Sequence, residues 1–161
     1  MSRRAGGRRH SVRRPPCETF PPGQLQTAER VVFVCTHNSA RSQLAAALWR
    51  DRVGGTVASA GTKPAARVHP RAIKIAHRHG LRLDPTGTAD VADVVHDGDL
   101  VIAVCDNAHE DLSGPVRPQL HWSVPDPVRV DTDAAFEAAY TELAQRIDRV
   151  APAVTHVPTQ N

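Results

Sequence analysis

The stretch that most constrains this chain is an apolar run that leads directly into a cysteine-containing octet. Residues 31–34 read Val-Val-Phe-Val, and residues 35–42 read Cys-Thr-His-Asn-Ser-Ala-Arg-Ser. Four consecutive apolar residues predict a buried strand, and Leu44 and Leu48 recur at helical spacing after the octet. A strand, a short loop and a helix that begins near Arg41 would direct successive backbone N–H groups at one point, as in proteins that hold phosphate-like anions. The sequence therefore predicts an oxyanion site that contains a thiol.

Four side chains of the octet suit this chemistry. A helix N-terminus and a nearby cation lower a cysteine pKa from about 8.5 to about 3.5–7.5, so Cys35 is predicted to be a thiolate nucleophile. Arg41 offers a planar fork of donors to two oxygens of phosphate or arsenate. Ser42 can donate to the sulfur, and Asn38, which tolerates left-handed backbone, can brace the loop. The alternative is a buried cysteine at a strand end beside an exposed arginine.

A candidate proton donor follows later in the chain, at Asp126. Displacing an alcohol or hydroxide from phosphorus or arsenic requires a proton on the departing oxygen, which a carboxyl group near Cys35 can supply. Pro125 and Pro127 restrict the backbone around Asp126, so the carboxyl is presented from a stiff loop. The alternative is an ordinary Asp-Pro turn.

The octet resembles that of the low-molecular-weight protein tyrosine phosphatases and of the thiol-dependent arsenate reductases that share their fold. The resemblance extends from about residue 30 to residue 150. Further segments resemble the family in the same order, namely Ser59-Ala60-Gly61-Thr62, Val68-His69-Pro70, Asp99-Leu100-Val101 and Asp126-Pro127.

This resemblance implies a fold and a set of roles. The fold is a three-layer α/β/α sandwich with a four-stranded parallel sheet. Cys35 is the nucleophile, Arg41 the oxyanion clamp, Ser42 the stabiliser of the thiolate and Asp126 the general acid. The oxyanion is held by the loop residues Thr36, His37, Asn38, Ser39, Ala40, Arg41 and Ser42. His37 is interpreted as filling the place of a smaller residue.

Alternating strand and helix patterns agree with parallel strands covered by helices on both faces. Strands are predicted at residues 31–34, 56–60, 100–104 and 119–124. Helices are predicted from about Arg41, between Pro70 and Gly80, over residues 90–95, and from Asp131 or Asp133 onward. The last helix carries an apolar stripe of Phe136, Tyr140, Leu143, Ile147 and Val150.

Length and composition favour one catalytic domain, residues 30–154, because a chain of 161 residues can bury a core without disulfides. Three cysteines and no secretory segment indicate a reducing cytoplasm. No run approaches the roughly 18 apolar residues of a membrane span. We expect no membrane association and no metal, since the histidines lack a ligand spacing.

The net charge of +3 is unevenly distributed. Residues 1–30 hold seven arginines and two glutamates, whereas residues 31–161 hold 13 basic and 15 acidic side chains. Residues 1–29 are therefore predicted to be a basic, disordered tail, and residues 155–161 a short C-terminal tail. A plain solvated extension is favoured over nucleic-acid binding, because the tail has no helical pattern.

Arsenate reduction and phosphate-ester hydrolysis need the same loop and differ in how the covalent adduct is resolved. Water hydrolyses a phosphocysteine, whereas a reductase needs a second thiol to attack sulfur and remove two electrons. Cys105, at the end of the third predicted strand, lies where the thioredoxin-linked reductases have a resolving cysteine. Their third cysteine corresponds to Leu112 here, so that three-thiol relay is broken. An inert buried cysteine is the alternative for Cys105.

Smaller signals resemble the reductases. Gln43 follows Arg41-Ser42, His121-Trp122 precedes the Asp-Pro loop, and residues 59–65 resemble the mycothiol-dependent branch, the arsenate-mycothiol transferases. Residues 128–130 lack the tyrosines that phosphatases carry there. Trp49 or Trp122 would supply an aromatic platform in their place if either faced the pocket.

The preferred prediction is an arsenate reductase with no tightly bound cofactor. Its arseno-Cys35 adduct would be resolved by Cys105 or by a small thiol such as mycothiol or glutathione, and a thioredoxin or glutaredoxin system would be its redox partner. The first alternative is a low-molecular-weight phosphatase that hydrolyses phosphomonoesters through phosphocysteine. The second is a non-enzymatic oxyanion-binding accessory.

Overall fold

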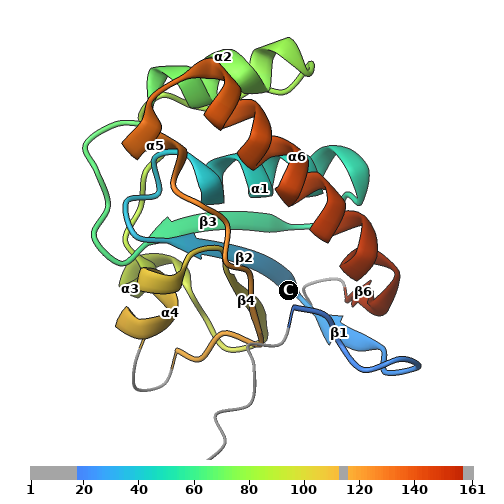
Figure 1. The fold of residues 1–161 in the computed structure, drawn as a ribbon. Helices are drawn as coiled ribbons and strands as arrows, with labels where there is room; N and C mark the ends of the chain where they lie inside the picture. The colour runs from blue at the N-terminus through green and yellow to red at the C-terminus, as the bar shows by residue number, and fades with distance from the viewer. Residues whose placement is uncertain (1–17, 113–115, 158–161) are drawn as a thin grey trace, which may run out of the picture.

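The computed structural model describes residues 18–112 and 116–157, and its centre is a sheet of four parallel strands (Figure 1). The strand order is β3-β2-β4-β5. The strands are β2 Arg30–Cys35, β3 Val57–Gly61, β4 Asp99–Ala103 and β5 Leu120–His121. Their register pairs Cys35 with Gly61 and Val34 with Ala103, so the ends of β2, β3 and β4 meet at one edge of the sheet. Ligands bind at this carboxyl edge in open parallel sheets.

Helices cover both faces of this sheet (Figure 1). On one side lie α1 Arg41–Arg52, α2 Pro70–Arg78 and α6 Asp133–Val150, and on the other lie α3 Val91–Val94 and α4 Asp106–Asp111. The short helix α5 Pro127–Val130 precedes α6, and a 3₁₀ turn, Ala151–Ala153, follows it. The predicted three-layer α/β/α sandwich with a four-stranded parallel sheet is confirmed.

The apolar patterns place the main helices as expected. Every residue of the predicted α6 stripe is buried, from Phe136 to Val150. The Thr132 hydroxyl caps α6 by accepting a hydrogen bond from the N–H of Ala135. Pro70 is the first residue of α2, and Gly80 takes a positive φ of 75° just after the helix, where the left-handed conformation suits glycine.

The sequence did not predict some helices, and other predicted elements are shorter in the structure. The helix α4 buries only Ala108, and α5 is a single turn begun by Pro127, so neither has a recognisable apolar period. The fourth strand covers two residues instead of six, because only Leu120 and His121 pair with β4. The helix predicted over residues 90–95 is reduced to Val91–Val94, with Asp90 as its N-cap.

The two ends of the described chain differ from the predicted tails. The strand β1, Gln26–Ala28, pairs in parallel with β6, Val154–His156, in a separate two-stranded sheet. The indole N–H of Trp122 also donates to the carbonyl of Glu18, at 2.8 Å. The prediction of tails is therefore wrong for residues 18–29 and 155–157, because three-residue strands that pair across the length of the chain carry no local signal. The rest of both predicted tails, residues 1–17 and 158–161, lies outside the described residues.

Within the described ranges, none of the helices combines the length and the apolar character needed to cross a membrane.

Candidate active site

The octet forms a loop at the carboxyl edge of the sheet, between the end of β2 and the start of α1. A second segment, residues 61–69, follows it closely through backbone hydrogen bonds. The N–H groups of Thr62, Lys63, Ala65 and His69 donate to the carbonyls of Cys35, Thr36, His37 and Ser39, at 2.8–3.1 Å. These bonds direct four of the loop carbonyls at residues 61–69, while the N–H of Asn38 points at the sulfur of Cys35.

Gly61 allows this close approach. A Cβ atom at position 61 would lie 2.7 Å from the carbonyl oxygen of Thr36 and 3.0 Å from Cβ of Asn38. Backbone atoms cannot move aside as a flexible side chain can, so a larger residue would displace the loop. The Ser59-to-Thr62 segment singled out in the sequence therefore has a steric function.

The sulfur of Cys35 lies inside the loop and is almost fully buried, with 2% of the residue exposed. Its Sγ accepts a hydrogen bond from the N–H of Asn38 at 3.2 Å and lies 2.9 Å from Oγ of Ser42. Nδ2 of Asn38 donates to that same Oγ at 2.7 Å. Between Oγ of Ser42 and Sγ of Cys35, either the hydroxyl or the thiol can be the donor.

Burial nevertheless has the largest influence on the Cys35 thiol and raises its pKa above the ordinary value. The hydrogen bonds from Ser42 and the positive charge of Arg41 lower the pKa and offset part of this rise. The neighbouring Cys105 raises it further. The lowered pKa predicted from the sequence is therefore contradicted, because desolvation of a sulfur packed inside the loop outweighs the nearby donors and charge.

Asn38 braces the loop from within. It is fully buried and takes a φ of 51°, the left-handed conformation that asparagine tolerates. Its Oδ1 accepts hydrogen bonds from the N–H of Ala89 at 3.0 Å and from Nε2 of Gln43 at 3.2 Å. Gln43 also donates to the carbonyl of Gly87 at 3.1 Å, which ties the loop to the segment before α3. Gln43 was noted in the sequence as a family signal; this scaffolding contact was not foreseen.

A cavity of about 230 Å³ opens beside the loop. Its lining residues are Arg41, Cys105, Asp106, Asn107, Val124, Pro125, Asp126 and Arg129. Three residues that the sequence analysis proposed for the site thus meet here, namely Arg41, Cys105 and Asp126. Asp106, Asn107 and Arg129 were not foreseen, although Asp106 directly follows Cys105 and Arg129 lies three residues after Asp126.

Arg41 and Asp126 face one another across this cavity. Nη2 of Arg41 lies 3.9 Å from Oδ2 of Asp126, and Nη1 donates to the carbonyl of Val124 at 2.8 Å. The other oxygen of Asp126, Oδ1, caps α5 by accepting the N–H of Val128 at 3.0 Å. One carboxylate oxygen therefore fixes the local turn, while the other lies on the side of Arg41.

Cys105 lies at the junction of β4 and α4. Its Sγ accepts the N–H of Ala108 at 3.3 Å and lies 3.6 Å from Oγ1 of Thr36, in the oxyanion loop. The residue is 2% exposed. The end of a parallel strand next to β2 thus brings a second sulfur to the loop that holds the first.

The remaining candidates take less central positions. His37 is exposed, and its Nδ1 lies 3.1 Å from the carbonyl of Lys63, outside the cavity lining. Trp49 and Trp122 have no exposed surface, so neither supplies an aromatic wall for a substrate. In the described part of the chain, no group of three or more His, Cys, Asp or Glu side chains is arranged to hold a metal ion.

Comparison with known proteins assigns the chain to a family. The model of the low molecular weight phosphotyrosine protein phosphatase family matches residues 30–158. The chain belongs to this family. It is similar to an arsenate reductase of Bacillus licheniformis, with 31% identity over 132 residues, which cover 75% of this chain and 94% of the relative. An arsenate reductase of Brevibacillus brevis is 29% identical over 134 residues, which cover 79% and 97%.

Solved structures are also similar to this chain in fold. An arsenate reductase from Archaeoglobus fulgidus matches with a TM-score of 0.67 and 27% identity, over 76% of this chain and 98% of that one. A tyrosine phosphatase from Erwinia amylovora matches in fold, with a TM-score of 0.70 and 21% identity, over 86% and 99%. Because the family and its arsenate reductase relatives are enzymes, the chain is an enzyme of this family.

Proposed function

We propose that this protein is an arsenate reductase in which Cys35 forms a covalent bond to arsenic. The observation that carries the proposal is a second thiol at the site: Cys105 lines the same cavity as Arg41 and Asp126 and contacts the oxyanion loop through Thr36. Hydrolysis of the covalent adduct needs only water, whereas a reductase requires a second sulfur to collect two electrons. The arsenate reductase relatives support the same function.

In the first step, arsenate binds to the backbone N–H groups of residues 36–42 and to the guanidinium of Arg41. The proton of Cys35 passes to an arsenate oxygen, because attack requires the thiolate and burial keeps the thiol protonated. Sγ then forms a bond to arsenic. Asp126 protonates the oxygen that departs, and it leaves as water.

In the second step, another thiol attacks Sγ of Cys35. The sulfur–arsenic bond breaks and its electron pair stays on arsenic, so As(V) becomes As(III) while the two sulfurs form a disulfide. The attacking thiol is Cys105 or a small external thiol such as mycothiol or glutathione. An external thiol, or a thioredoxin or glutaredoxin system, then supplies two electrons to reduce the disulfide. This requirement supports a cytoplasmic location.

Phosphomonoester hydrolysis is the second candidate, and one contact favours it. Sγ of Cys105 caps α4 by accepting the N–H of Ala108, which is a structural use of this cysteine that needs no redox step. Cys35 would then form a phosphocysteine, which water hydrolyses.

Purified protein incubated with arsenate and each thiol system, and in parallel with an aryl phosphate, separates the two candidates. We expect arsenite with at least one thiol system and little phosphate release. Cys35→Ser should abolish turnover, and Cys17→Ser, at the remaining cysteine, serves as the matched control. Loss of arsenate turnover in Cys105→Ser would assign the resolving step to Cys105, and retention would assign it to the external thiol. Phosphate release without arsenite would overturn the proposal.

A further inference from the structure

A continuous set of contacts links the oxyanion loop to the helix that carries Asp126. It starts at His69, the N-cap of α2, whose backbone N–H donates to the carbonyl of Ser39 at 2.8 Å. The first residue after this cap is Pro70, which fixes the helix start. The N-terminus of α2 is therefore held directly against the loop that binds the oxyanion.

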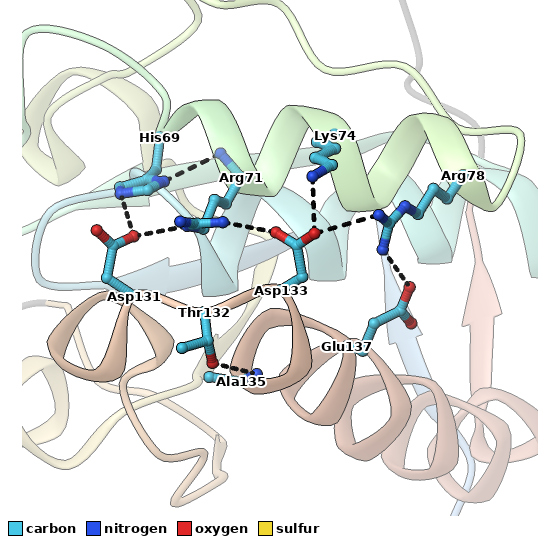
Figure 2. A network of polar contacts seen from close by, with 9 residues as sticks. All are labelled: His69, Arg71, Lys74, Arg78, Asp131, Thr132, Asp133, Ala135 and Glu137. Atoms are coloured by element: carbon cyan, nitrogen blue, oxygen red, sulfur yellow. Dashed lines mark hydrogen bonds and ion pairs between the residues drawn. The ribbon is translucent and has the colours of Figure 1, made fainter.

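The same histidine reaches toward Asp131. Nδ1 of His69 accepts the N–H of Arg71 at 3.1 Å, so the ring proton of the neutral form lies on Nε2. That Nε2 lies 3.4 Å from Oδ1 of Asp131, and Nε of Arg71 donates to the same oxygen at 2.9 Å (Figure 2). The ring of His69 also packs on buried Phe136, with 4.9 Å between ring centroids. Two side chains of α2 thus hold one carboxylate.

Asp131 lies at the far end of the turn that begins with Asp126. The two residues flank α5, whose four residues join the N-cap Asp126 to the C-cap Asp131. Asp131 takes the left-handed conformation, φ 55° and ψ 48°, and its N–H donates to the carbonyl of Pro127 at 2.9 Å. Because only four residues separate them, a displacement of Asp131 is expected to displace Asp126.

We propose that Asp131 is a positioning residue, which, held by His69 and Arg71, sets the distance between the Asp126 carboxyl group and the oxyanion loop. This inference rests on the proposed role of Asp126 as proton donor. The contacts form a closed circuit, from the loop through α2, Asp131 and α5 to Asp126, and back to the loop through Arg41, 3.9 Å away. Asp131 is not among the residues that line the cavity, so it acts on Asp126 through the turn.

Asp133, two residues further on, provides a matched control. It accepts hydrogen bonds from Arg71 at 2.6 Å, Lys74 at 2.7 Å and Arg78 at 3.1 Å, so it shares the cations of the network (Figure 2). It belongs to the first turn of α6 and lies outside the turn that ends at Asp131. Removal of its charge should weaken the attachment of α6 to α2 and leave Asp126 in place.

The test is a double-mutant cycle with Asp126, measured on both arsenate and an aryl phosphate so that the choice of substrate does not decide the result. Asp131→Asn keeps a residue that tolerates positive φ, and we expect kcat to fall about tenfold with KM changed less than about twofold. In the Asp126→Asn background the same change should lower kcat less than about twofold, because Asp131 acts through Asp126. Asp133→Asn should leave kcat within about twofold in both backgrounds.

Asp131→Gly, which also accepts the left-handed conformation, repeats the test if the asparagine variant folds poorly. An effect of Asp131→Asn that is equally large with and without the Asp126 carboxyl would overturn the inference, as would an unchanged kcat in the folded variant. Turnover of aryl phosphate without arsenate reduction would refute the proposed function. The double-mutant cycle could still be measured with the aryl phosphate.

Discussion

Two regions of the molecule use similar polar groups in opposite environments. One is the proposed oxyanion loop, residues 35–42, and the other is the charged face between α2 and α6, which carries Arg71, Lys74, Arg78, Asp131 and Asp133. In the loop, Asn38 and Ser42 have no exposed surface, and Nδ2 of Asn38 donates to Oγ of Ser42. On the charged face, Asp133 is shared by three cations, and the side chains of Lys74 and Arg78 are 51% and 46% exposed. Water and redundant partners make a single contact on that face worth about 0–1 kcal/mol. The same kinds of bonds therefore shape the reaction site where they are buried, whereas at Asp133 they chiefly adjust stability.

In the comparison of these two regions, the largest expected effect on kcat comes from Arg41→Lys in the loop. The lysine ammonium cannot donate in parallel to two oxygens, and it would lose the bond to the Val124 carbonyl that holds the guanidinium in place. We expect kcat to fall about 10²-fold. Steady-state kinetics measure this loss, and Arg71→Lys on the charged face should change kcat much less. Similar losses at both positions would remove the contrast between the two regions.

Asn38→Ala should cost about 3 kcal/mol of unfolding free energy. It removes hydrogen bonds to Ser42, Gln43 and Ala89, leaves the half-buried N–H of Ala89 without its partner, and places alanine at positive φ. Denaturant unfolding measures the loss. Asn38→Gly separates the two causes, because glycine accepts the conformation and loses only the bonds, so it should be about 1 kcal/mol less destabilising. Equal losses would mean that the left-handed backbone carries no strain.

Whether the sequence predicts a contact in these two regions depends on how far apart the contacting residues lie along the chain. The loop was predictable because strand, loop and helix are consecutive, so Cys35, Asn38 and Ser42 come together without the rest of the fold. The layered fold followed from the alternation of short apolar strands with helices that carry a periodic apolar face. Gln43 was noticed only as a family signal, since its partner Gly87 lies on a distant segment.

The charged face was not predictable in the same way. The contacts of Arg71 with Asp131 and Asp133 join residues about 60 positions apart, and exposed charges follow no period that a sequence reveals. The pairing of β1 with β6 was missed for the same reason. The pKa of Cys35 was misjudged because burial of the sulfur depends on the packing of residues 61–69 and 105 around it, whereas the loop sequence reveals only the donors.

The protonation of Cys35 gives a smaller and more specific test. Because burial raises the pKa of this thiol, its alkylation by iodoacetamide should be slow at neutral pH and speed up as the pH rises. Ser42→Ala removes a hydrogen bond that lowers the pKa, so alkylation at neutral pH should slow about tenfold further. Mass spectrometry of the Cys35 peptide follows the rate. Fast, pH-independent alkylation above pH 6 would show that the donors outweigh burial and would restore the thiolate predicted from the sequence.

The smallest effect is expected from Asp133, whose pKa is held down to about 2 by Lys74 and Arg71. A carboxyl group with a folded-state pKa below its ordinary value of about 3.9 stabilises the fold while it is ionised. Its contribution is complete above about pH 5 and is lost as the pH falls through about 2. The difference in melting temperature between the wild-type protein and Asp133→Asn should therefore be small near pH 6 and should shrink as the pH falls from about 5 to 2. Lys74→Met removes the largest cause of the lowered pKa, so in that background the difference should already be smaller at pH 6. A difference that persists unchanged at pH 2 would mean that Asp133 acts through its shape and packing, and the charged face would then resemble the buried loop more closely than its exposure suggests.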